Sequence, residues 1–293
     1  MLTVTSCAES VFYLNLESYE QKGRLMMKKG IAYYRFFLKE EAKYKINFIS
    51  YLLSGVIQLI AVLFIWRLVY SSTGNGVIEG LNYQEIILYT IISTIATQFM
   101  ELNNDYQIAG DIQDGNLSYE LIRPVSYIYK LFFQGLASST VSILLISVPT
   151  MIGVITYLSI HTSFQIAIVR ALLFLLIVTI SMGLMFCTNL LFGYSAFYLN
   201  YSWGFLLFKG TFIRLLSGAL FPLIMLPESI RTIFLKSPFS YLTYFPTMVF
   251  LGKLTTGDII SNLVIQFIWL AVFIVLCLVL WRHSIKTITI NGG

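Results

Sequence analysis

Six long apolar stretches constrain this chain more than any other feature of its sequence. Each is close to the ~20 residues that a helix needs to cross the hydrocarbon core of a bilayer. Backbone polar groups in lipid must find partners within their own segment, so each stretch is predicted to form an α-helix. The six predicted spans lie at about 46–70, 86–102, 130–157, 165–192, 203–226 and 259–281.

The composition supports a membrane protein and argues against several other classes. Of the 293 residues, 57% are hydrophobic and 11% are charged, and the mean hydropathy is +0.79. An ordinary soluble domain has about 25% charged residues. These values argue against a soluble enzyme, a disordered chain and a nucleic-acid-binding protein. They predict an all-α polytopic protein embedded in the lipid bilayer.

The N-terminal part differs from the rest of the chain. Residues 1–27 are polar and mixed in charge, so we expect a poorly ordered or mis-assigned extension before a membrane domain at 28–293. In residues 28–45 one helical stripe carries Ile31, Tyr34, Leu38 and Ala42. A basic amphipathic helix with aromatic residues is typical of a segment in the membrane interface. A solvated lead-in to the first span is the alternative.

Basic residues set the predicted orientation. Eight Lys or Arg residues precede the first span, whereas the loops after the first and third spans contain none. The C-terminal tail carries Arg282 and Lys286. Lys and Arg concentrate on the cytoplasmic side of membrane proteins. We therefore expect an integral protein of a bacterial plasma membrane with both termini in the cytoplasm.

Two segments break the pattern of spans and short loops. Asn103–Tyr129 is predicted to be the longest polar cytoplasmic loop. On the outer side, Leu226–Asp258 is too apolar for a free loop and too interrupted by prolines for a span. Irregular backbone at membrane depth is tolerated only where protein covers it or where it lines a cavity. The outer segment is therefore predicted to form a pair of short re-entrant helices.

Residues that commonly carry chemistry are sparse. His161 and His283 lie on opposite sides of the membrane in this topology, and the three cysteines lack metal or disulfide spacing. Gly252-Lys253 is followed by Leu254 where a P-loop requires Ser or Thr. We expect no catalytic residue, no metal site and no cofactor bound by this chain.

Two motifs resemble those of ABC-2 type permeases, in the subgroup related to daunorubicin-resistance-like exporters. The first lies in Asp111–Tyr127 and matches the family's cytoplasmic segment at Ile112, Gly115, Leu117, Leu121, Arg123 and Pro124. The second lies in Leu216–Gly252 and matches the stretch near the family's fifth span at Ser217, Gly218, Pro222, Pro227, Pro238, Phe239, Pro246 and Gly252. The basic C-terminal tail is also similar to that of the family.

The resemblance implies an export permease that works with a separate ATP-binding subunit. Two permease chains, as a homodimer or a heterodimer, are expected to pair with two ATP-binding subunits that hold ATP and Mg. In this family the loop after the second span carries a coupling helix that docks on the ATPase. By analogy, the coupling segment here is Gly110–Pro124, which includes Asp111. The second motif would form an extracellular gate.

The residues of the coupling segment are compatible with a short helix. Gly115 permits a sharp backbone turn, and Leu117 and Leu121 are four residues apart on one helical face. Pro124 ends a helix, because it lacks a donor and crowds the previous turn. An ordinary polar loop with a proline stop is the alternative.

Ionisable residues within spans are functional hypotheses by default. Lys209 and Arg214 are five residues apart in the fifth span, or about 7–8 Å along a helix axis. Lys209 is expected to extend toward the cytoplasmic interface, and Arg67 and Arg170 toward the nearer interfaces. Arg214 should face protein or a water-filled translocation path. It either contacts an anionic group on a substrate or pairs with Glu101, with the ion pair favoured.

The leading hypothesis is a permease that exports a small hydrophobic, drug-like, peptide or lipid-like substrate. Export of a polysaccharide or a lipid-linked glycan is the alternative within the same class. An ion-coupled secondary transporter or channel would be expected to carry carboxylates within its spans. A membrane-embedded enzyme would be expected to carry a cluster of His, Asp or Ser residues at one depth in the membrane.

Overall fold

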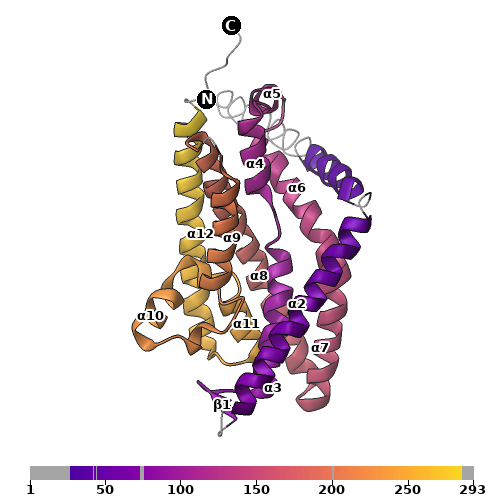
Figure 1. Cartoon of the computed structure of the whole chain (residues 1–293), viewed down its shortest axis with the longest axis vertical. Helices are drawn as coiled ribbons and strands as arrows, with labels where there is room; N and C mark the ends of the chain where they lie inside the picture. The colour runs from indigo at the N-terminus through magenta and orange to yellow at the C-terminus, as the bar shows by residue number, and fades with distance from the viewer. Residues whose placement is uncertain (1–26, 42, 44, 73–75, 200, 286–293) are drawn as a thin grey trace, which may run out of the picture.

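The computed structural model describes residues 27–41, 43, 45–72, 76–199 and 201–285, most of them helical (Figure 1). The extension expected at 1–27 lies outside the described residues except for Met27, as does the end of the C-terminal tail. The helices pack side by side in an elongated bundle (Figure 1).

Five of the six predicted spans are confirmed as helices long and apolar enough to cross a membrane, counted over the described part of the chain. Their elements are α2 (Lys45–Ser72), α3 (Tyr83–Phe99), α4 (Asn104–Gln113), α6 (Tyr127–Ser142), α7 (Val148–His161), α8 (Phe164–Gly193) and α12 (Thr256–Ser284). A π-helical turn, Ile143–Ser147, joins α6 to α7 just before Pro149. The wider turn keeps this helix continuous next to a residue that has no N–H to donate.

The remaining predicted span, 203–226, is shorter as a helix than expected. It contains α9 (Trp203–Leu216), whose 14 residues give a length of about 21 Å against a hydrocarbon core of about 30 Å. The chain leaves the helix at Ser217 and Gly218, where Gly218 has a φ of 76°. Apolar residues continue beyond this turn, which is why hydropathy alone extended the span. A sixth crossing stays a prediction.

The polar segment after the second span is not the loop that the sequence predicts. Its first half is α4, and a short helix, α5 (Leu117–Ile122), follows. A break at Asn103, with a φ of 47°, separates α3 from α4, and asparagine tolerates this conformation better than most residues. Asn104 and Asp105 are buried where α4 packs on α6, α8 and α9. The loop prediction was wrong here because the polar side chains of α4 bind partners inside the bundle.

Residues 27–41 form the amphipathic helix expected at the start of the membrane domain. It packs against α6, where the Tyr34 hydroxyl lies 3.1 Å from Thr140 Oγ1. A Cβ atom on Gly30 would lie 2.6 Å from the ring of Phe133, so the missing side chain permits close approach. Of the expected stripe, Tyr34 and Leu38 are partly buried, whereas Ile31 is 45% exposed.

Short elements gather toward the end of the bundle opposite α5 (Figure 1). A hairpin of β1 (Val77–Ile78) and β2 (Leu81–Asn82) connects α2 to α3. After α9 the chain forms η3 (Leu223–Met225), α10 (Glu228–Lys236), η4 (Pro238–Tyr241) and α11 (Tyr244–Leu251). This is the segment expected to be re-entrant. Its insertion from the outer side stays a prediction.

Helix α8 lies inside the bundle and contacts α4, α7, α11 and α12. Its buried residues Phe174 and Ile177 share one core with Tyr241 and Phe250 of the segment that follows α9. In lipid, close packing and interhelical hydrogen bonds hold helices together, because lipid tails are as apolar as the side chains. The segment from η4 to α11 is therefore part of the core and not a surface loop.

We expect Gly218→Ala to destabilise the protein more than Gly80→Ala. The two glycines have φ values of 76° and 77°, so each substitution carries a similar backbone strain of about 1 kcal/mol. At Gly218 the new methyl group would also lie 3.0 Å from Tyr244 Cβ and from the Tyr89 hydroxyl, whereas Gly80 has open space. Thermal unfolding of the purified chain measures the difference, and equal losses would contradict this packing.

Candidate functional site

The first motif, Asp111–Tyr127, forms a sharp turn and a short helix at the tip of the molecule (Figure 1). Gly115 connects α4 to α5 with a φ of 74°, a conformation that favours glycine. Leu117 is buried, whereas Leu121 is 37% exposed. The two leucines, expected on one face, therefore have different surroundings. Leu117 anchors α5 to the bundle, and Leu121 is available at the surface.

Polar contacts fix this motif to the start of α6. The Tyr127 hydroxyl donates to Asp111 Oδ2 at 2.7 Å. Lys130 Nζ lies 2.9 Å from Glu120 Oε2, and Arg123 lies 3.2 Å from the other oxygen of the same carboxylate. Helices α4 and α5 are therefore each tied to α6.

The remaining residues of the first motif have surroundings that suit their side chains. Gly110 lies on α4 with open space beside it, and Ile112 packs on the hydrophobic core. Arg123 has an extended backbone with a ψ of 145°, as expected for the residue before a proline. Helix α5 therefore ends at Ile122, and Pro124 keeps the chain from continuing it.

A buried ion pair joins α9 to α4 and α8. Lys209 Nζ lies 2.6 Å from Asp105 Oδ2 and 2.8 Å from Asn189 Oδ1. The side chains of Lys209 and Asp105 are 5% and 1% exposed. Lys209 therefore does not extend to the cytoplasmic interface, as the sequence suggested. An anionic and an amide oxygen within the bundle satisfy the ammonium group instead.

A cavity of about 490 Å³ lies against this ion pair, between α2, α3, α4, α8 and α9, and we refer to it as the α9 cavity. Its polar lining includes Gln58, Thr94, Glu101, Asn189, Lys209 and Arg214. Leu59, Val62 and Leu206 contribute apolar surface. A cavity with both polar and apolar lining suits an amphipathic molecule better than a purely apolar one.

The structure brings Arg214 and Glu101 to the same cavity. Both were singled out from the sequence as candidates for the translocation path. Among the described residues, the salt bridges include Lys209 with Asp105 but not Arg214 with Glu101. The sequence did not reveal that Asp105 and Asn189 bind Lys209. One lies in a polar segment and the other in an apolar segment, and nothing in the sequence indicated that the two are close in space.

The second motif surrounds the turn that ends α9. The Tyr89 hydroxyl donates to the Gly218 carbonyl at 2.7 Å, and the Tyr244 N–H donates to the Ser217 carbonyl at 2.9 Å. This turn therefore connects α9 with α3 and with α11. Phe239, another residue of the motif, packs on the main core.

Each proline of the second motif lies at or near the start of a helical element, where its missing N–H costs no hydrogen bond. Pro222 and Pro227 immediately precede η3 and α10, Pro238 is the first residue of η4, and Pro246 is the third of α11. The nine residues of α10 are all at least partly exposed, whereas α11 is buried over most of its length. The prolines thus divide the segment into a surface helix and an inner helix.

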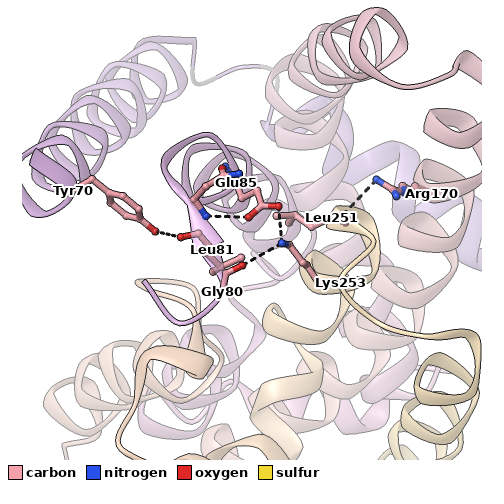
Figure 2. A network of polar contacts seen from close by, with 8 residues as sticks. Tyr70, Gly80, Leu81, Glu85, Arg170, Leu251 and Lys253 are labelled. Atoms are coloured by element: carbon pink, nitrogen blue, oxygen red, sulfur yellow. Dashed lines mark hydrogen bonds and ion pairs between the residues drawn. The ribbon is translucent and has the colours of Figure 1, made fainter. Parts of the chain in front are cut away.

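A polar network holds the C-terminal end of α11 in place (Figure 2). Lys253 Nζ lies 2.6 Å from Glu85 Oε1 at the start of α3 and donates to the Gly80 carbonyl of the hairpin at 3.2 Å. Arg170 of α8 donates to the Leu251 carbonyl at 3.3 Å. The position of Arg170 at a membrane interface stays a prediction, and the structure shows that its guanidinium binds this helix end.

The sequence contained part of the signal for this network. Asn82 and Glu85 form a capping box at the start of α3, a pattern readable as Asn-x-x-Glu before an apolar run. Gly252, at the end of α11, has a φ of 72°, and a Cβ atom there would collide with the Arg170 guanidinium. The glycine of the motif is thus explained by this contact.

Comparison with protein families gives a match over most of the chain. The family described as ABC-2 family transporter protein matches residues 56–292 of this chain. No curated protein and no solved structure matches it. The matched range includes both motifs, the network at the end of α11 and the lining of the α9 cavity except Ser54 and Gly55.

We expect Lys209→Met to reduce the free energy of unfolding by about 3–5 kcal/mol, because it leaves the Asp105 carboxylate buried without its countercharge. Lys253→Met is the matched control. It removes an ion pair whose side chains are 29% and 27% exposed, and such pairs contribute about 1 kcal/mol or less.

Chemical denaturation of the two purified variants measures the difference. Adding Asp105→Leu to Lys209→Met should recover part of the loss, because the unpaired charge is then removed. A Lys209→Met variant as stable as the wild type would contradict the buried pair.

Proposed function

This chain belongs to the ABC-2 transporter family, and we propose that it is the transmembrane permease subunit of an ATP-driven exporter. A separate ATP-binding subunit would bind ATP and Mg and supply the energy. The observation that carries this proposal is α5, a short helix held at the tip of the bundle by the buried Leu117 and by the ion pair of Glu120 with Lys130. A permease that receives its energy from a partner needs such an anchored docking element.

The contacts of the structure support a route from the docking element to the transport path. Helix α5 is tied to α4 through the Gly115 turn and to α6 through Lys130. Helix α4 is joined to α9 through Asp105 and Lys209. A displacement of α5 would therefore move α9, which forms one wall of the α9 cavity.

The proposed assembly contains two copies of the ATP-binding subunit and a second permease chain, either identical or related. The cytoplasmic end of each chain would be the end that carries α5, so that both termini lie in the cytoplasm. The membrane would be a bacterial plasma membrane, as the positive-inside distribution and the family resemblance suggest.

The α9 cavity supports a small cargo. Its volume of about 490 Å³ is within the range of small-molecule sites, about 300–1,000 Å³, which favours a small amphipathic, drug-like, peptide or lipid-like molecule over a polysaccharide. An ion-coupled secondary transporter is less well supported, because the carboxylate of Asp105 is already bound by Lys209.

Helices α10 and α11 would act as the outer gate. Helix α11 occupies the core, and its end is fixed by Lys253, Glu85 and Arg170 (Figure 2). The Gly218 turn connects this segment directly to α9. Movement of α9 would therefore be transmitted to α11, and release of α11 would open the path outward.

We expect Leu121→Asp and Gly115→Val each to weaken co-purification of the ATP-binding subunit with the tagged full chain. The first places a charge on the exposed part of α5, and the second forces a branched side chain into a left-handed turn. Val77→Asp, on a 51% exposed hairpin residue at the opposite end, is the control.

Both coupling variants should remain in the membrane at wild-type levels, since neither residue is buried. The purified complex should hydrolyse ATP, and the chain alone should not. Wild-type recovery of the ATP-binding subunit with both variants, or ATP hydrolysis by the isolated chain, would overturn the proposed division of labour.

We expect single cysteines at Glu228 and Lys236 to react with a membrane-impermeant thiol reagent from outside the cell, in a background with the native cysteines replaced. Both residues are exposed on α10, whereas Thr247 of α11 is fully buried and a cysteine there should not react. Labelling of the α10 positions from the cytoplasmic side alone would contradict the orientation.

A further inference from the structure

We propose that the α9 cavity binds an amphiphile with an anionic, phosphate-like head group and that Arg214 binds this group. The inference rests on the proposed function, because it names the chemical class of the cargo. It goes beyond that function because it assigns recognition of the negatively charged head group to Arg214. The sequence left this residue between two roles, an ion pair with Glu101 and a contact with a substrate.

Arg214 differs from the other cation of its helix. Five residues separate it from Lys209, which places the two about 140° apart around the helix axis. Lys209 is buried and bound by Asp105 and Asn189. Arg214 is exposed on the cavity side, and its guanidinium has no side-chain hydrogen bond or ion pair among the residues that the structure describes.

A guanidinium at membrane depth needs an anion or water. Two other arginines bind acceptors within the protein. Arg170 binds the Leu251 carbonyl, and Arg231 binds Glu79 and the Ile224 carbonyl. Both carboxylates that line the α9 cavity are engaged, Asp105 with Lys209 and Glu101 in an interaction of its own. Arg214 is therefore the cationic group that the cavity offers to a ligand.

The geometry of a guanidinium favours phosphate or carboxylate, which it binds through two parallel hydrogen bonds. The threonine hydroxyls on α3 complement this group. Thr90, Thr94 and Thr97 line the cavity and donate to carbonyls of their own helix. Their oxygens remain available as acceptors, so they suit hydroxyl or amino groups next to the anion.

The rest of the cavity accommodates an apolar tail. Leu59, Val62 and Leu207 provide apolar lining. Gly55 and Gly210 also line the cavity, and a Cβ atom on either would meet open space. The cavity is therefore wider at these two positions than it would be if they carried side chains. A head group at Arg214 and a tail beside Gly210 would both fit within it.

The test measures saturable binding of radiolabelled dodecyl phosphate to the purified full chain in phosphatidylcholine nanodiscs. Arg214→Gln should weaken binding by at least about tenfold, the loss expected for a hydrogen-bonded charge pair, while Arg214→Lys should retain part of the affinity. Arg67→Gln removes an arginine that does not line the cavity, and it should bind as the wild type does.

A second pair of variants tests the tail. Gly210→Leu should abolish binding by filling the cavity, with no loss of thermal stability, because the new side chain meets no protein atom within 4 Å of its Cβ. Gly204→Leu is the control, since it has the same open surroundings on α9 but does not line the cavity.

Competing ligands distinguish the possible sources of the anion. Unlabelled dodecyl phosphate should compete, whereas inorganic phosphate, dodecyl maltoside and dodecyltrimethylammonium should not. Competition by inorganic phosphate alone would replace the amphiphile by a free anion, and equal competition by the maltoside would remove the role of charge. Either result, or unchanged binding by Arg214→Gln or by Gly210→Leu, overturns the inference. The assay contains no ATP-binding subunit, so its failure would leave the co-purification test of the proposed function unaffected.

Discussion

The arrangement of the bundle depends on one buried charge, the ammonium group of Lys209. A lysine deep in a low-dielectric interior requires an anion and further acceptors, and Asp105 and Asn189 supply them. These contacts join α9 to α4 and to α8 within the bundle. Arg214 lies five residues further along α9 and lines the same cavity as Lys209.

The two ends of the molecule are linked through that charge. Helix α4, which leads into the first motif, contacts α9 through Asp105. Helix α9 in turn contacts the second motif at the Gly218 turn, whose carbonyl accepts a hydrogen bond from the Tyr89 hydroxyl. Helix α3 contributes to both, because α4 continues from it and Glu85 at its start binds Lys253. Short polar contacts therefore connect the elements that carry the two motifs, within an otherwise apolar bundle.

Hydropathy predicted five of the spans because each is a long apolar helix. It failed at α9 because Leu220 and Phe221 keep the sequence apolar after Gly218 has ended the helix. It failed at α4 because residues such as Asp105 look solvent-exposed when they are read alone. The turn at Gly115 and the stop at Pro124 were predictable, since local backbone chemistry determines them. The partners of Lys209 were not, because tertiary packing alone brings them together.

The short length of α9 has a consequence for the order in which the protein is made. Asp105 and Asn189 both precede Lys209 in the chain, so the ribosome completes them before the lysine emerges. A 14-residue helix with a central cation is a poor substrate for insertion on its own hydrophobicity. We therefore expect stable integration of α9 to depend on α4 and α8, which precede it and carry the carboxylate and the amide. These two helices would provide the site that receives Lys209 when α9 joins the bundle.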